Sequence, residues 1–163
     1  MTPACRVVRN SPWHPTPGRT IATLQPRMEH AMAFSILIVD DQPELAGLMS
    51  DLLADAGYDT CTADNGRHAL SEVQSNPPDL VLLDVNMPEL DGFEVAAMLK
   101  ADPSTATIPI IMVSAQDGRA SRLIGLESGA EDYMSKPVDP AELITKIRNL
   151  LLLRDRSAHA ARH

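Results

Sequence analysis

Residues 79–92 read DLVLLDVNMPELDG, an apolar run that ends on the carboxylate of Asp84. A strand built from residues such as Leu82 and Leu83 is normally buried on both faces, so Asp84 falls at the rim of a hydrophobic core. An unpaired charge in that position is costly. The stretch therefore predicts a buried strand whose end carries a functional acid.

The segments on either side of this run alternate short apolar stretches with helical patterns. Strands are expected at 35–39, 58–62, 79–84, 108–113 and 131–135. Helices are expected at about 45–56, 66–75, 92–101, 118–128 and 140–153. Five strands that alternate with five helices indicate an α/β fold, a doubly wound parallel sheet with right-handed crossovers.

Two of the expected helices carry apolar residues at helical spacing. In the first, a single buried stripe that ends before Gly57 is predicted for Leu45, Leu48, Met49, Leu52, Leu53 and Ala56. In the last, the predicted stripe consists of Leu143, Ile147, Leu150 and Leu151. Leu152 falls outside this second stripe, because nine residues at about 100° each turn it to the opposite side from Leu143.

Charge is distributed unevenly along the 163 residues. Residues 1–31 hold four Arg and one Glu, and residues 154–163 hold three Arg and one Asp. The intervening segment holds seven basic and twenty acidic residues, which argues against direct nucleic-acid binding by the folded domain. We expect a disordered tail over 1–33, one domain over 34–153 and a short basic tail over 154–163.

Neither a membrane segment nor a secretory signal is expected. No stretch approaches the roughly 20 apolar residues of a membrane-spanning helix. The N-terminus also lacks the apolar core of a secretory signal. The sequence is therefore interpreted as that of a cytoplasmic protein that does not contact the membrane.

Polar residues follow most of the predicted strands. Asp40 and Asp41 end the first strand, Asp84 the third, Ser114 the fourth and Lys136 the fifth. Each alone has a simpler explanation: the first two and Ser114 could cap helices, and Lys136 could be a solvated turn residue. Because the carboxyl ends of parallel strands meet at one edge of the sheet, their coincidence there favours a binding site.

The residue types at this edge point to phosphoryl transfer. Three clustered carboxylates repel one another unless a cation neutralises them, and oxygen ligands without a nearby His or Cys suit Mg²⁺. Lys136 adds a positive charge and Ser114 a hydroxyl donor, so the site could surround a group with several negative oxygens. Asp84 could then act as the nucleophile and form an aspartyl phosphate.

Several motifs together resemble the receiver domain of two-component response regulators, the CheY-like superfamily. They are ILIVDDQPE, LVLLDVNMPELDG, Ser114 with Ala115, and GAEDYMSKPVDPAEL, and the resemblance spans about 34–153. It implies a flavodoxin-like fold with strand order 2-1-3-4-5. It also implies a signalling domain that catalyses its own phosphorylation and dephosphorylation, rather than an ordinary enzyme.

The resemblance assigns a role to each residue of the edge. Asp84 would accept the phosphoryl group, and Mg²⁺ would be held by Asp40, Asp41, Asp84 and the backbone carbonyl of Asn86. Ser114 and Lys136 would contact the phosphoryl oxygens. Ser114 and Tyr133 would form the switch. Pro137 matches a family proline whose preceding peptide bond is typically cis.

Partners also follow from the resemblance. The donor would be a sensor histidine kinase or a histidine phosphotransfer protein, and a downstream output protein would respond. Homodimer or partner contacts would lie on the fourth helix, the fifth strand and the fifth helix, that is 118–128, 131–135 and 140–153. Only about ten residues follow Leu153, so the output is expected to be a separate protein unless the chain is a fragment.

Other functions remain open at this point. The chain could be a phosphorelay intermediate, or a degenerate receiver that only binds a partner. A haloacid-dehalogenase-type phosphatase would need a second acid two residues after the nucleophile, where this chain has Asn86. A flavodoxin-like cofactor binder would need a phosphate loop after the first strand, and none is present.

Overall fold

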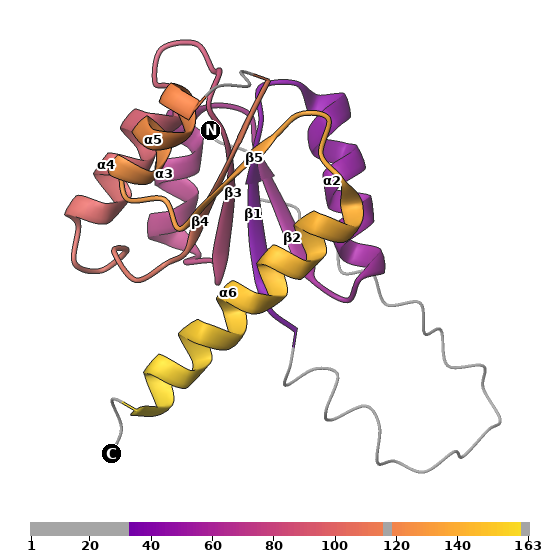
Figure 1. Cartoon of the computed structure of the whole chain (residues 1–163), viewed down its shortest axis with the longest axis vertical. Helices are drawn as coiled ribbons and strands as arrows, with labels where there is room; N and C mark the ends of the chain where they lie inside the picture. Colours follow the sequence, from indigo (N-terminus) through magenta and orange to yellow (C-terminus); the bar gives the residue numbers. More distant parts are fainter. Residues whose placement is uncertain (1–32, 116–118, 161–163) are drawn as a thin grey trace, which may run out of the picture.

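Short apolar runs form the strands of one parallel sheet. The computed structural model of the chain describes residues 33–115 and 119–160. Its strands are β1 (Ser35–Val39), β2 (Asp59–Ala63), β3 (Leu80–Asp84), β4 (Ile110–Ser114) and β5 (Asp132–Ser135). They lie side by side in the order β2-β1-β3-β4-β5 (Figure 1). The predicted fold class and strand order are confirmed.

Helices connect successive strands. They are α2 (Pro43–Asp55), α3 (Gly66–Ser75), α4 (Gly92–Ala101), α5 (Arg119–Glu127) and α6 (Pro140–Ala160). Pro43 occupies the first turn of α2, where its missing N–H is not needed. Gly57 follows this helix with φ of 97°, a conformation that glycine adopts without steric cost. Gly66 and Gly92 each begin a helix after an N-cap residue whose side chain accepts a backbone N–H, Asn65 and Asp91.

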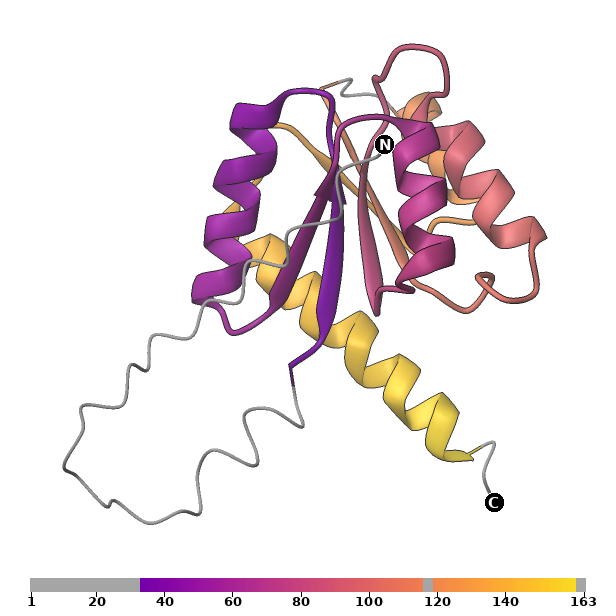
Figure 2. The ribbon, with the colours of Figure 1, turned by 180° about the vertical axis from the view of Figure 1, so that it is seen from behind.

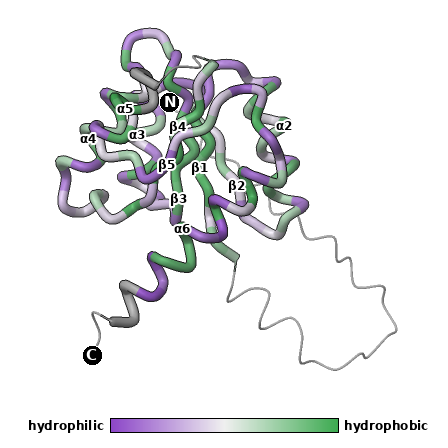
Figure 3. Tube along the Cα trace, viewed as in Figure 1, coloured by the Kyte–Doolittle hydropathy of each residue, from purple (hydrophilic) through white to green (hydrophobic). Residues whose placement is uncertain are grey.

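Each central strand is buried on both faces. Along β1, Ile36 and Ile38 face one hydrophobic cluster while Leu37 and Val39 face the other. The first cluster includes side chains of α2 and α6, and the second includes side chains of α3 and α4. Figure 3 shows the hydrophobic strands in the middle of the more polar helices. This double burial accounts for the continuous apolar runs in the sequence.

The buried face of α2 differs from the predicted stripe. Leu48 is 66% exposed and Ala56 is exposed, whereas the helix buries Ala46, Ser50, Leu53 and Ala54. The predicted stripe is confirmed in part, because Leu53 is fully buried and Met49 and Leu52 pack against the core as partly buried residues. Small side chains let α2 approach the sheet, and Ser50 Oγ lies 2.6 Å from Thr60 Oγ1 of β2 in a buried hydrogen bond.

Helix α6 is longer than predicted. Leu143, Ile147 and Leu151 are buried as expected, and Leu152 is 50% exposed, also as expected. The helix nevertheless continues past Leu153 to Ala160, so most of the segment predicted as a basic tail is helical. Figures 1 and 2 show it crossing one face of the sheet and extending beyond the sheet edge.

A polar contact holds the C-terminal half of α6 against the sheet. Arg154 donates from Nη1 to the backbone oxygen of Asp79 at 2.7 Å and lies 3.4 Å from its carboxylate. The same carboxylate accepts the backbone N–H of Ser35 at 2.8 Å, so Arg154 ties α6 to the start of the sheet. The predicted N-terminal tail, residues 1–33, lies almost entirely outside the described residues.

None of the helices in the described part of the chain combines the length and the apolar character that crossing a membrane requires.

Candidate functional site

Strand register brings the predicted polar residues to one edge of the sheet. Val39 pairs with Leu83, so Asp40 follows β1 at the level where β3 ends in Asp84. Ser114 pairs with Ser135, which places Lys136 directly after the end of β5. The sequence predicted this shared edge from the parallel topology alone, and the structure confirms it.

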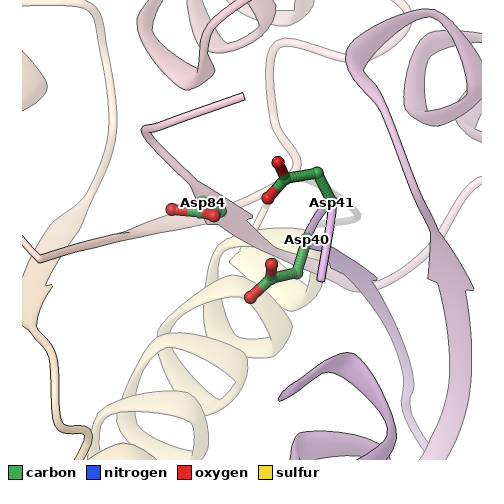
Figure 4. Close-up of side chains that lie close together, drawn as sticks. All are labelled: Asp40, Asp41 and Asp84. Carbon is green, nitrogen blue, oxygen red and sulfur yellow. The ribbon is translucent and has the colours of Figure 1, made fainter. Parts of the chain in front are cut away.

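Three carboxylates converge at this edge. Each of Asp40, Asp41 and Asp84 offers an oxygen, and these atoms lie within 4.8 Å of one another. Figure 4 shows Asp84 at the tip of β3, beside the two acids that follow β1. Asp40 and Asp84 are each 5% exposed, whereas Asp41 is exposed. The arrangement offers several oxygen ligands on one side to a small cation, with access from solvent.

Lys136 reaches the two buried carboxylates. Its Nζ lies 3.4 Å from an oxygen of Asp40 and 3.4 Å from an oxygen of Asp84, and its side chain is only 21% exposed. Its backbone N–H donates to the carbonyl oxygen of Ser114 at 2.8 Å, which fixes where the side chain begins. The peptide bond to Pro137 is cis, as the resemblance implied. A solvated turn does not describe this lysine.

Burial raises the pKa of Asp84 above its ordinary value. The nearby charge of Asp40 acts in the same direction. Lys136 and the backbone N–H of Asn86, which donates to Asp84 Oδ1 at 3.2 Å, oppose the shift without cancelling it. Such a carboxylate is stabilised by an additional positive charge, which fits a divalent cation among these oxygens.

The loop after Asp84 depends on a glycine. A Cβ on Gly92 would lie 2.5 Å from the backbone oxygen of Asp84 and 2.9 Å from Cα of Val85, so a side chain cannot be accommodated there. The Gly92 N–H also donates to the Val85 carbonyl at 3.0 Å. Asn86, predicted as a metal ligand through its carbonyl, is exposed in this loop. Met87, in the same loop, is 8% exposed.

The remaining predicted residues lie at or just below the edge. Asp40 accepts the backbone N–H of Gln42 at 2.9 Å, so it also supports the entry into α2, although the N-cap of that helix is Gln42. Ser114 is fully buried at the end of β4. Tyr133, the predicted switch residue, is 5% exposed and belongs to the hydrophobic cluster beneath α3 and α4. Met49, predicted only as part of the buried stripe of the first helix, also lines a small cavity beside Asp40 and Asp84.

Comparison with known proteins identifies the family. Residues 36–148 match the response regulator receiver domain, and the chain belongs to this family. The response regulator PleD of Caulobacter vibrioides is 43% identical over 119 residues, which cover 73% of this chain and 26% of PleD. RpaA of Synechocystis sp., a DNA-binding dual master transcriptional regulator, is 40% identical over 128 residues, which cover 78% of this chain and 53% of RpaA.

Solved structures agree with this assignment. The chemotaxis protein CheY4 of Vibrio cholerae has a TM-score of 0.69 and 30% identity, covering 72% of this chain and 98% of CheY4. The receiver domain of a signal transduction histidine kinase from Syntrophus aciditrophicus has a TM-score of 0.69 and 36% identity, covering 73% of this chain and 90% of that domain. The chain therefore spans a complete receiver fold, but about half or less of the curated relatives it matches.

Proposed function

We propose that Asp84 accepts a phosphoryl group from a phosphohistidine of a sensor histidine kinase or a histidine phosphotransfer protein. The observation that carries this proposal is the buried Asp84, flanked within 4.8 Å by the oxygens of two further aspartates and at 3.4 Å by Lys136 Nζ. A buried acid surrounded in this way is costly to keep for stability alone. It is well placed for attack on phosphorus.

The transfer step needs an ionised Asp84. One of its carboxylate oxygens forms the new P–O bond while the P–N bond of the phosphohistidine breaks, and the bonding electron pair stays on the imidazole nitrogen. Lys136 offers its ammonium group to the phosphoryl oxygens as their charge shifts. Hydrolysis removes the phosphoryl group again: water attacks phosphorus, and the products are inorganic phosphate and the free carboxylate of Asp84.

A magnesium ion fits the donor set of this edge. Asp40, Asp41 and Asp84 would hold it with the backbone carbonyl of Asn86, and water would complete the coordination. When bound, Mg²⁺ supplies positive charge that offsets the repulsion among the carboxylates and the phosphoryl oxygens. Asp41 is the exposed member of the set, so it is the residue through which the ion would exchange with solvent.

Phosphorylation would be read through Ser114 and Tyr133. Ser114 would contact a phosphoryl oxygen, and the ring of Tyr133 would favour the buried position. The surface of α5, β5 and α6 would then change its affinity for a second copy or for an output protein. Leu123 and Ile124 on α5 and Leu152 on α6 are each about half exposed, so each of these helices could offer apolar area to a partner.

The central test is phosphorylation by acetyl phosphate in the presence of Mg²⁺. We expect one phosphoryl group per chain, labile to acid and base, with the modified peptide containing Asp84. Asp84→Asn should abolish the modification, because an amide of nearly the same shape cannot attack phosphorus. Asp51→Asn, an exposed position on α2, is the matched control and should leave the rate unchanged. Labelling of Asp84→Asn at the rate of the unsubstituted chain would refute the assignment.

The predicted absence of nucleic-acid binding stays a prediction. RpaA and MtrA are named as DNA-binding proteins, but the match covers only about half of their length. A binding assay with duplex DNA at low salt would test the prediction for this chain. The acidic balance of residues 32–153 leads us to expect no retention.

A further inference from the structure

Helix α5 turns its bulky apolar side chains toward solvent. Leu123 is 51% exposed, Ile124 is 50% exposed and Leu126 is 42% exposed. Among the side-chain positions of α5 that the structure describes, 123–127, Gly125 alone is buried. Within 123–127, α5 therefore faces the domain through a residue that has no side chain.

The backbone does not explain why glycine occupies this position. Gly125 lies inside the helix, without the positive φ found at Gly57 and Gly129. Glycine is among the least favourable residues in a helix interior, and alanine is the most favourable. The reason must lie in the space that a side chain would enter.

That space is occupied by the ring of Tyr133. A Cβ on Gly125 would lie 3.0 Å from Cδ2 and 3.5 Å from Cε2 of Tyr133, and 3.5 Å from Cε1 of Phe93. Contacts of 3.0 Å require the neighbour to move by a few tenths of an ångström. Tyr133 cannot yield easily, because it is 5% exposed and packs within the cluster that contains Met112, its register partner on β4.

We propose that Gly125 is a positioning residue that admits the ring of Tyr133 beneath α5, and that the buried ring in turn sets where α5 lies. The proposal rests on the proposed function only where it links the ring to phosphorylation. In that scheme the buried ring belongs to the phosphorylated form. A Cβ at residue 125 would disfavour the buried ring and shift the equilibrium away from the activated state.

The contact itself is tested by a stability cycle. Gly125→Ala should lower the melting temperature when Tyr133 is present, because the new methyl group presses on the ring. In a Tyr133→Ala background the same substitution should raise the melting temperature, because the space is open and alanine favours the helix. Gly47→Ala on α2, where a Cβ meets nothing within 4 Å, should raise it in both backgrounds.

The proposal is supported if Gly125→Ala lowers the melting temperature when Tyr133 is present and raises it in the Tyr133→Ala background. A change of melting temperature in the same direction in both backgrounds would overturn the proposal. If Gly125→Ala alone fails to fold, folding of the double variant supports the contact, and failure of both variants counts against it.

The link to activation is tested with beryllofluoride, which mimics the phosphoryl group. In the presence of Mg²⁺, Gly125→Ala should bind beryllofluoride several-fold more weakly than the unsubstituted chain, while its affinity for Mg²⁺ alone stays the same. Equal beryllofluoride affinity would overturn the role of Gly125 in activation. No beryllofluoride binding by the unsubstituted chain would instead refute the proposed function, so the two failures are distinguishable.

Discussion

Replacing Asp84 with asparagine should stabilise the protein in the absence of metal. Lys136 Nζ attracts the Asp84 carboxylate across 3.4 Å, by about 5 kcal/mol at an effective dielectric constant of 20. The buried Asp40, within 4.8 Å, repels it by about 3.5 kcal/mol on the same scale, and the exposed Asp41 adds about 1 kcal/mol at the dielectric constant of water. The attraction and the repulsion nearly cancel. The cost of removing a 5% exposed carboxylate from water is therefore not compensated, and it lowers the stability of the metal-free protein.

The expected gain for Asp84→Asn is about 1 to 2 kcal/mol without metal, or about 3 to 8 °C in melting temperature for a domain of this size. Saturating Mg²⁺ should make the unsubstituted chain more stable than Asp84→Asn. At 100 times its dissociation constant the ion stabilises the unsubstituted chain by about 2.7 kcal/mol, whereas the asparagine variant lacks a charged ligand and should gain little. In thermal melts, Asp84→Asn should therefore have the higher melting temperature without Mg²⁺, and the unsubstituted chain should have the higher one with saturating Mg²⁺.

The pH dependence separates this charge effect from a packing effect. Because the pKa of Asp84 is raised in the folded state, the folded chain binds more protons than the unfolded chain between the ordinary and the raised pKa. The free energy of unfolding therefore falls as pH rises through that window. The advantage of Asp84→Asn should vanish below the ordinary aspartate pKa, where residue 84 is neutral in both proteins. A metal-free variant that melts below the unsubstituted chain at neutral pH would refute the reasoning.

Three further outcomes are expected. Arg154→Met should lower the free energy of unfolding by about 1 kcal/mol in urea denaturation, since the Arg154 hydrogen bond to the backbone of Asp79 ties α6 to the sheet. Deleting residues 1–31 should leave the melting temperature and acetyl phosphate labelling unchanged, and a large loss of either would contradict the predicted tail. Leu152→Asp should weaken association of the beryllofluoride-activated protein in analytical ultracentrifugation without slowing phosphorylation, and unchanged association would exclude this face of α6.

The sequence contained enough information to predict the sheet and the edge that carries the proposed site. Runs such as 80–83 are apolar at every position because both faces of the sheet are covered, and parallel strands deliver whatever follows them to one edge. Asp40, Asp84 and Lys136 could therefore be brought together without coordinates. Their burial and the distances between them could not, since these depend on how the loops after the strands pack.

The prediction for α2 was wrong for Leu48 and Ala56, which are exposed, and it omitted the small residues that the helix buries. Leu53 is buried as predicted, but the helix also buries Ala46 and Ser50, whose small size permits close approach to the sheet. A hydrophobicity pattern cannot weigh that advantage. The true end of α6 was missed for a different reason: its partner, Asp79, lies 75 residues away in the sequence.

Gly125 illustrates a third limit of sequence reasoning. The sequence predicts a helix at 118–128 and gives no signal that its glycine has a particular role. In the structure the apolar residues on either side of the glycine are about half exposed, and the glycine faces the ring of Tyr133. Within 123–127, the helix therefore leaves about half of each large apolar side chain exposed and approaches the domain most closely at a glycine. A shift of the Tyr133 ring would therefore be felt at this point of the helix, and the half-exposed apolar residues beside it lie where a partner could contact them.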